Sequence, residues 1–305
     1  MLAIEAVGLS KQYGQRIGVT GLNMEVRQGE IFGFIGPNGA GKSTTIRMLM
    51  QLIHPTSGSL QVLGEALDRE KPELRKRIGY LPSEVMLYPQ MTGKQALELT
   101  ARAYGRRLKD TPAMNYAERL QWNPDLKMKS YSLGNRKKLG IILSLLHQPE
   151  LLILDEPTSG LDPLIQRELF QLLSELNRQE GMTIFFSTHV LSEVEKLCER
   201  VAFIKEGQLL RVNRLEELSS GRTHRVSVQF DTPGDQRETL PLKELDAQIQ
   251  FDGIYHTLEA SGPKLSSLLA ALSGLPVQDL EIRRPTLEEL FMDDYRARNE
   301  EGEEA

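Results

Sequence analysis

The chain has 305 residues, a formal net charge of −5 at pH 7 and a pI near 5.7. A hydrophobic fraction of 40% and a charged fraction of 26% are typical of a soluble protein, and the length allows two domains. The acidic balance argues against a general nucleic-acid-binding protein, so no nucleic-acid partner is expected. One cysteine, Cys198, excludes an internal disulfide and a cysteine-built metal site, and fits a reducing, cytosolic compartment.

The N-terminal region, from Leu2 to about Val26, has the alternating pattern of β-strands. Neither this terminus nor any apolar run, such as 139–146, predicts a signal peptide or a membrane span. Tyr13 lies in this region, upstream of a glycine-rich loop. An exposed tyrosine there could stack on a purine ring, although the spacing alone favours an ordinary β-sheet tyrosine.

A strand, a glycine-rich loop and a helix follow one another from Ile31 to Ile53. The apolar run 31–35 enters the pattern Gly-x-x-x-x-Gly-Lys-Ser at 36–43, and apolar residues then recur at helical spacing until His54-Pro55. Such a loop binds phosphate through backbone N–H groups, a lysine charge and a hydroxyl that binds Mg²⁺. The context disfavours a chance glycine-rich turn, and we expect a nucleoside triphosphate to be bound by Gly36, Pro37, Asn38, Gly39, Ala40, Gly41, Lys42, Ser43 and Thr44.

The next segment changes from strands to helices. Strands are predicted at Ser59–Leu63 and Ile78–Leu81. Between about 85 and 147 the apolar spacing indicates helices, one with Leu97, Ala101 and Tyr104 on a shared face and another with Ala117, Leu120 and Gln121. This pattern predicts a helical subdomain inserted in an α/β core.

The polar stretch Ser130–Asn135 opens a further helix with an apolar face. Small residues at a helix start can bind an anion through free N–H groups. A simple serine N-cap explains this segment equally well.

Two acids, Asp155 and Glu156, end the apolar strand that begins at Leu151. Ligands of parallel sheets bind at the carboxyl ends of the strands, so we expect one acid to hold Mg²⁺ and the other to orient water, rather than a solvated turn. The strand Thr183–Thr188 ends at His189, on the same edge. A lone histidine is usually structural, but this position makes it a candidate.

The remainder of the chain divides after a hairpin at 201–212. Before the hairpin, Cys198 follows apolar residues at helical spacing and is expected in the core. The expected domains are 1–218, a linker at Leu218–Gly221, and an α+β accessory domain at 225–295. A capping box at Thr286 and Glu289 predicts a last helix, and residues 296–305 are expected to be an acidic, disordered tail.

Together, these motifs resemble the nucleotide-binding subunit of ATP-binding cassette (ABC) transporters over residues 2–218. The resemblance implies an α/β P-loop core with a β-rich N-terminal part and a helical subdomain. It also implies an ATPase in which Tyr13 stacks on adenine, Asp155 supports Mg²⁺, Glu156 is the general base or orients water, and His189 contacts the γ-phosphate, with Lys42 on the phosphates.

The family works as head-to-tail dimers in which ATP lies between the phosphate loop of one subunit and the signature of the other. By resemblance, the signature residues Ser132, Gly134 and Asn135 reach the γ-phosphate of the partner's ATP, and Asp162 lies at the dimer interface. The partner is a second copy or a paralogue.

The sequence departs from the family pattern at Leu133 and Ser83. Leu133 replaces the first glycine of the usual Leu-Ser-Gly-Gly-Gln signature. Ser83 replaces a glutamine that touches Mg²⁺ and the attacking water, and its shorter side chain would need a bridging water. Both changes could slow hydrolysis or alter its coupling to transport.

The C-terminal region, with Arg283–Phe291, resembles the extension of the drug-resistance and ABC-2 exporter branch. This implies an ATP-hydrolysing exporter subunit at the cytoplasmic face of the membrane, bound to a separately encoded permease. One alternative is a soluble ABC-type ATPase acting on ribosomes, DNA or another macromolecule. A GTPase or small-molecule kinase leaves Ser132–Asn135 and His189 unexplained.

Overall fold

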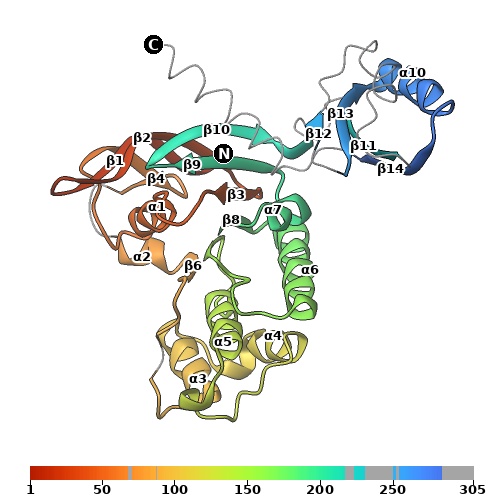
Figure 1. The fold of residues 1–305 in the computed structure, drawn as a ribbon. Coiled ribbons are helices and arrows are strands. Elements are labelled where there is room, and N and C mark those ends of the chain that lie inside the picture. Colours follow the sequence, from red (N-terminus) through yellow and green to blue (C-terminus); the bar gives the residue numbers. More distant parts are fainter. Residues whose placement is uncertain (68–70, 87, 217–222, 231–249, 252–253, 284–305) are drawn as a thin grey trace. The chain divides into compact units, whose positions relative to one another are not determined.

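The computed structural model divides the chain into two compact units, Met1–Leu215 and Glu216–Ala305 (Figure 1). It describes residues 1–67, 71–86, 88–216, 223–230, 250–251 and 254–283. The predicted linker at 218–221, the capped last helix at 286 and the acidic tail at 296–305 lie outside the described residues.

A six-stranded sheet forms the centre of the first unit, in the order β10-β9-β3-β8-β7-β6. All neighbours are parallel except β10, which pairs antiparallel with β9. Strands β3, β7 and β8 are buried at every residue, because both faces of the sheet are covered. The strands are β3 Ile31–Ile35, β6 Ile78–Leu81, β7 Leu151–Asp155, β8 Thr183–Thr188, β9 Arg200–Lys205 and β10 Gln208–Arg214.

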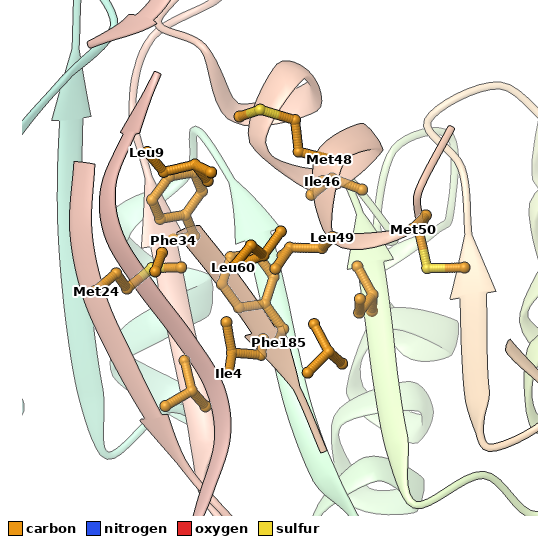
Figure 2. Close-up of a cluster of buried hydrophobic side chains, with 14 of the residues drawn as sticks. Ile4, Leu9, Met24, Phe34, Ile46, Met48, Leu49, Met50, Leu60 and Phe185 are labelled. Atoms are coloured by element: carbon orange, nitrogen blue, oxygen red, sulfur yellow. The ribbon is translucent and has the colours of Figure 1, made fainter. Parts of the chain in front are cut away.

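A second, antiparallel sheet of the first unit has the order β2-β1-β4-β5. Its strands are β1 Leu2–Tyr13, β2 Arg16–Arg27, β4 Ser57–Val62 and β5 Glu65–Ala66. The two sheets and the helix α1, Lys42–Leu49, enclose a common apolar core (Figure 2). In this core the rings of Phe34 and Phe185 lie with their centroids 5.3 Å apart. The core thereby fixes α1, and the loop before it, to the carboxyl end of β3.

The predicted helical region folds as a group of helices that Figure 1 shows away from β1 and β2. It contains α3 Gly93–Ala103, η1 Leu108–Asp110, α4 Ala113–Arg119, η2 Met128–Ser130 and α5 Leu133–Leu145, after a short α2 at Pro72–Arg75. A capping box between Thr92 and Gln95 starts α3.

Helix ends are where the sequence-based boundaries were wrong. The first helix ends at Leu49 instead of at His54-Pro55, and Gln51 already has a φ of 54°. Gln121 was expected on the second helix of the inserted region, but α4 ends at Arg119 and Gln121 has a φ of 51°. Left-handed backbone cannot continue an α-helix, so both residues lie in turns.

Helices α6, Pro163–Glu180, and α7, Leu191–Leu197, complete the first unit. Asp162 caps α6 by accepting a hydrogen bond from Ile165 N. Cys198 caps the end of α7 and is buried, as predicted. No helix among the described residues has the length and apolar character needed to cross a membrane.

The second unit contains a four-stranded antiparallel sheet, in the order β12-β13-β11-β14, and one described helix. The elements are β11 Thr223–Phe230, β12 Gln250–Phe251, β13 His256–Ser261, α10 Gly262–Leu272 and β14 Val277–Arg283. Val226, Val228 and Phe230 form a small core with Leu268 and Leu272 of α10. The alternating strand and the helix predicted for this region are therefore present.

Candidate nucleotide-binding site

The loop between β3 and α1 has the geometry of a phosphate-binding loop. Gly41 precedes the helix with a φ of 107°, and a Cβ there would lie 2.7 Å from the carbonyl oxygen of Gly18. A Cβ on Gly36 would lie 2.2 Å from the carbonyl oxygen of Ile204. Both positions therefore require glycine, and the free N–H groups at the start of α1 are left for an anion.

Lys42 extends back over this loop. Its Nζ donates hydrogen bonds to the carbonyls of Gly36, at 2.6 Å, and Pro37, at 3.2 Å. The same Nζ lies 3.4 Å from Oε1 of Glu156. The ammonium is thus held at the mouth of the loop, where it can meet phosphate oxygens.

Asp155 and Ser43 provide a site that fits Mg²⁺. Ser43 Oγ donates to Asp155 Oδ2 at 3.0 Å, and Ser187 Oγ donates to Oδ1 at 3.2 Å. Burial raises the pKa of Asp155, and the two hydroxyl donors partly oppose that effect. A hydroxyl and one carboxylate are oxygen donors of the kind that Mg²⁺ uses together with waters and phosphates. Among the described residues there is no cluster of three histidine, cysteine or acidic side chains that could hold a metal alone.

Glu156 follows β7 in left-handed backbone, with a φ of 51°. This conformation separates its side chain from that of Asp155, and Oε2 lies 2.8 Å from Nδ1 of His189. Oε1 is buried and accepts no hydrogen bond from the described residues. One carboxylate oxygen is therefore tied to the histidine, while the other lies beside the Lys42 ammonium without a hydrogen-bond donor among the described residues.

A cavity of about 560 Å³ lies in front of these groups. Most of the sequence-predicted site residues line it, namely Tyr13, Asn38, Gly39, Gly41, Lys42, Ser43, Thr44, Ser83 and Glu156. Gly36, Pro37 and Ala40 belong to the loop but do not line the cavity. Asp155 and His189 do not line it either, but they contact two residues that do, Ser43 and Glu156 respectively. Of the strand-end residues, Glu156 thus lines the cavity directly, and Asp155 and His189 are joined to its lining by hydrogen bonds.

Four further residues line the cavity that the sequence reasoning missed: Arg16, Ile17, Gly18 and Arg47. Arg47 lies four residues after Ser43, which is one helical turn, so helical spacing could have identified it. The other three are the first residues of β2, and the antiparallel pairing of β2 with β1, in which Arg16 lies opposite Tyr13, brings them to the cavity. Lys11 Nζ lies 5.4 Å from the centroid of the Tyr13 ring.

The predicted signature residues lie outside this cavity. Ser132 caps α5 by accepting a hydrogen bond from Asn135 N at 3.2 Å. A Cβ on Gly134 would lie 2.6 Å from the carbonyl oxygen of Gly160. Leu133, which stands where the family pattern has glycine, is 62% exposed, and its side chain packs over Gly160 in the loop before α6.

Comparison with known proteins gives a family consistent with this geometry. The family model for the ABC transporter matches residues 19–159. The chain is 37% identical to the bacitracin transport ATP-binding protein BcrA of Bacillus licheniformis over 95% of this chain and 96% of that protein. It is 30% identical to the linearmycin resistance ATP-binding protein LnrL of Bacillus subtilis (strain 168), over 95% and 97%.

Solved structures agree in fold. The structure of an ATP-binding subunit of an ABC transporter superposes with a TM-score of 0.62 at 30% identity, covering 72% of this chain and 92% of that one. A dimeric cassette in a post-hydrolysis state, bound to ADP and Pi, superposes with a TM-score of 0.64 at 24% identity, covering 70% and 98%. Because the two Bacillus relatives are 30–37% identical over 95% of its length and the family model matches the region of the phosphate loop, this chain belongs to the ABC transporter ATP-binding proteins and is a nucleotide-binding ATPase.

Proposed function

We propose that the chain is the ATPase subunit of a drug-resistance-type exporter and acts on a separately encoded permease at the cytoplasmic face of the membrane. Its relatives include proteins named for bacitracin transport and linearmycin resistance, matched over nearly their whole length. In this proposal residues 1–218 form the ATP-binding domain and 225–295 an accessory domain that supports assembly, while the permease binds the substrate.

The carrying observation is the hydrogen-bonded arrangement at the ends of β7 and β8. Ser43 and Asp155 would hold Mg²⁺, which would neutralise charge on the phosphates when bound. Glu156 would orient the attacking water through Oε1, with His189 fixing Oε2. Lys42 would bind the β- and γ-phosphates. Catalysis would then be mostly positioning and charge stabilisation.

Hydrolysis would require a second subunit, either a copy or a paralogue. Ser132, Gly134 and Asn135 lie outside the cavity of their own chain and at the start of a capped helix. These residues would meet the phosphates of the partner's ATP, and Asp162 and Leu133 would lie at the same interface. Tyr13, 43% exposed beside the cavity, would stack on adenine.

The test is purification of the tagged chain from detergent-solubilised membranes of its source organism, with mass-spectrometric identification of co-purifying chains. A stoichiometric multi-span partner, and ATPase activity that Lys42→Ala removes, are expected. Because the loop lysine is needed for nucleotide binding but not for permease contact, Lys42→Ala should still recover the partner. Ribosomal or other soluble partners without a membrane chain would favour the soluble ABC-type ATPase instead.

A further inference from the structure

Lys137 in α5 is a buried lysine next to the nucleotide site. Its side chain is 1% exposed, and its Nζ donates a hydrogen bond to the backbone carbonyl of Ser83 at 2.7 Å. Lysine is almost never fully buried unless its charge has partners, because removing an ammonium from water is costly. A lysine in this position therefore needs a reason beyond packing.

The backbone around Ser83 rests directly on α5. One helical turn after Lys137, a Cβ on Gly140 would lie 2.6 Å from Leu81 Cδ1 and 2.7 Å from Val85 Cγ2. A larger residue at Gly140 would push this segment away from the helix. Segment 81–85 therefore contacts α5 at two positions. It packs closely on Gly140, and the carbonyl of Ser83 accepts a hydrogen bond from the Lys137 ammonium.

Two acids at the end of β7 partly compensate for the burial of the Lys137 charge. Burial lowers its pKa, and the carboxylates of Asp155 and Glu156 act in the opposite direction. The ammonium therefore lies within the electrostatic field of both acids of the nucleotide site, while its hydrogen bond goes to the segment that presents Ser83 to the cavity.

The same helix begins at the signature. Ser132 caps α5 five residues before Lys137, which corresponds to about 7.5 Å along the helix axis. Backbone hydrogen bonds make a helix of this length stiff. A displacement of its cap residue Ser132 would therefore also displace Lys137 and Gly140 of the same helix. The helix consequently connects the signature to the Ser83 segment of the same chain.

We infer that Lys137 is a positioning residue for ATP hydrolysis, which holds the Ser83 carbonyl and makes the Ser83 segment move with the signature helix. Contact of Ser132 with the partner's nucleotide would thereby set the position of Ser83 at this chain's own nucleotide. The inference rests on the proposed function, because it concerns the same site and its dimer.

The first experiment compares full-length wild type with Lys137→Met, Lys137→Arg and the control Lys138→Met. Lys138 is the adjacent lysine of α5, and its Nζ lies 3.5 Å from the carbonyl of Gln121 instead of Ser83. ATP affinity is measured by titration calorimetry, kcat and KM by phosphate release, and folding by thermal unfolding.

We expect Lys137→Met to lower kcat by about 10- to 100-fold, the scale of a misplaced reacting group, with ATP affinity within about 2-fold of wild type. Lys137→Arg keeps a charged donor and should recover part of the loss, while Lys138→Met should retain the wild-type kcat. A folded Lys137→Met variant with wild-type kcat, or one whose ATP affinity falls as much as its kcat, would overturn the inference.

A second measurement needs no variant. Hydrogen–deuterium exchange of the wild-type chain, with and without ATP and Mg²⁺, should show protection changing together in 81–85 and 133–140. Independent changes in the two segments would contradict the coupling.

A different outcome would refute the proposed function: wild-type protein that binds ATP but never hydrolyses it, alone or with its permease. In that case the exchange result would still decide whether the two segments are coupled.

Discussion

Replacing Glu156 by glutamine removes one carboxylate charge and leaves the shape of the site. Glutamine has nearly the same volume, can keep the contact with His189 and accepts left-handed backbone no worse than glutamate. The change takes the negative charge from Oε1, which lies 3.4 Å from the Lys42 ammonium and accepts no hydrogen bond from the described residues. The substitution therefore tests whether Glu156 orients the attacking water, and the fold should be unchanged.

The expected effect on turnover follows from that geometry. A positioned general base contributes about 10²- to 10⁴-fold, or roughly 2.7–5.5 kcal/mol of barrier. Glu156→Gln should lose that factor in kcat, measured by phosphate release. ATP affinity should be kept or tightened, because a negative charge next to the triphosphate is gone, and a dimer trapped with ATP should appear by size exclusion with light scattering.

Glu206→Gln is the matched control. Glu206 also has left-handed backbone, with a φ of 49°, but its side chain is 83% exposed and lies outside the cavity. This variant should match wild type in kcat and ATP affinity. Loss of a general base should lower kcat by far more than about threefold. If kcat of Glu156→Gln stays within that factor of the wild-type value, Glu156 does not have the role assigned to it.

Further predictions concern the loop, the core and the cysteine. Gly41→Ala should weaken ATP binding at least about 10-fold, as measured by calorimetry, because the added Cβ would collide with the Gly18 carbonyl. Gly39→Ala should have a smaller effect on ATP binding. The added Cβ has no neighbour within 4 Å, and only the backbone strain at a φ of 83° remains. Equal effects would refute the steric argument. Phe185→Ala should destabilise the first unit by about 3–5 kcal/mol in denaturant unfolding, because this buried ring packs in the shared core, and a loss below about 1 kcal/mol would contradict that. Burial raises the pKa of the Cys198 thiol, so a thiol reagent at pH 8 should label the chain only as the first unit unfolds, and rapid labelling of native protein would refute its burial.

The strands of the central sheet and the groups at their ends could be predicted from the sequence. Buried parallel strands are rich in apolar residues: β3 is apolar throughout, β7 is apolar up to Asp155, and β8 has the apolar centre Ile184–Phe186 between hydroxyl residues. Because parallel strands share one carboxyl edge, Asp155 and His189 could be placed near the phosphate loop without knowing the order of the strands. The structure gives the contacts through Ser43 and Glu156 that join them.

Residues that depend on antiparallel pairing or on turns could not be predicted in this way. Ile17 reaches the cavity because β1 and β2 pair in a specific register, in which it lies opposite Gln12. No local pattern carries that information. The early end of α1 depends on the left-handed backbone of Gln51, a residue type that helices usually tolerate well.

Lys137 shows why a buried charge is hidden from sequence reasoning. In a helix with an apolar face, lysines at 137 and 138 would both be assigned to solvent, and only the packed structure separates them. Lys137 contacts the backbone of Ser83, whereas Lys138 does not, and this contact bears on the role of Ser83. Its side chain is too short to replace the glutamine that the family carries there, but its backbone is held by Lys137 and its segment is seated on Gly140. A short side chain on a fixed backbone can position a water molecule reproducibly, whereas the same side chain on a mobile loop cannot. On the inference drawn for Lys137, we therefore expect hydrolysis with a serine at position 83 to depend on the hydrogen bond from Lys137 to the Ser83 carbonyl.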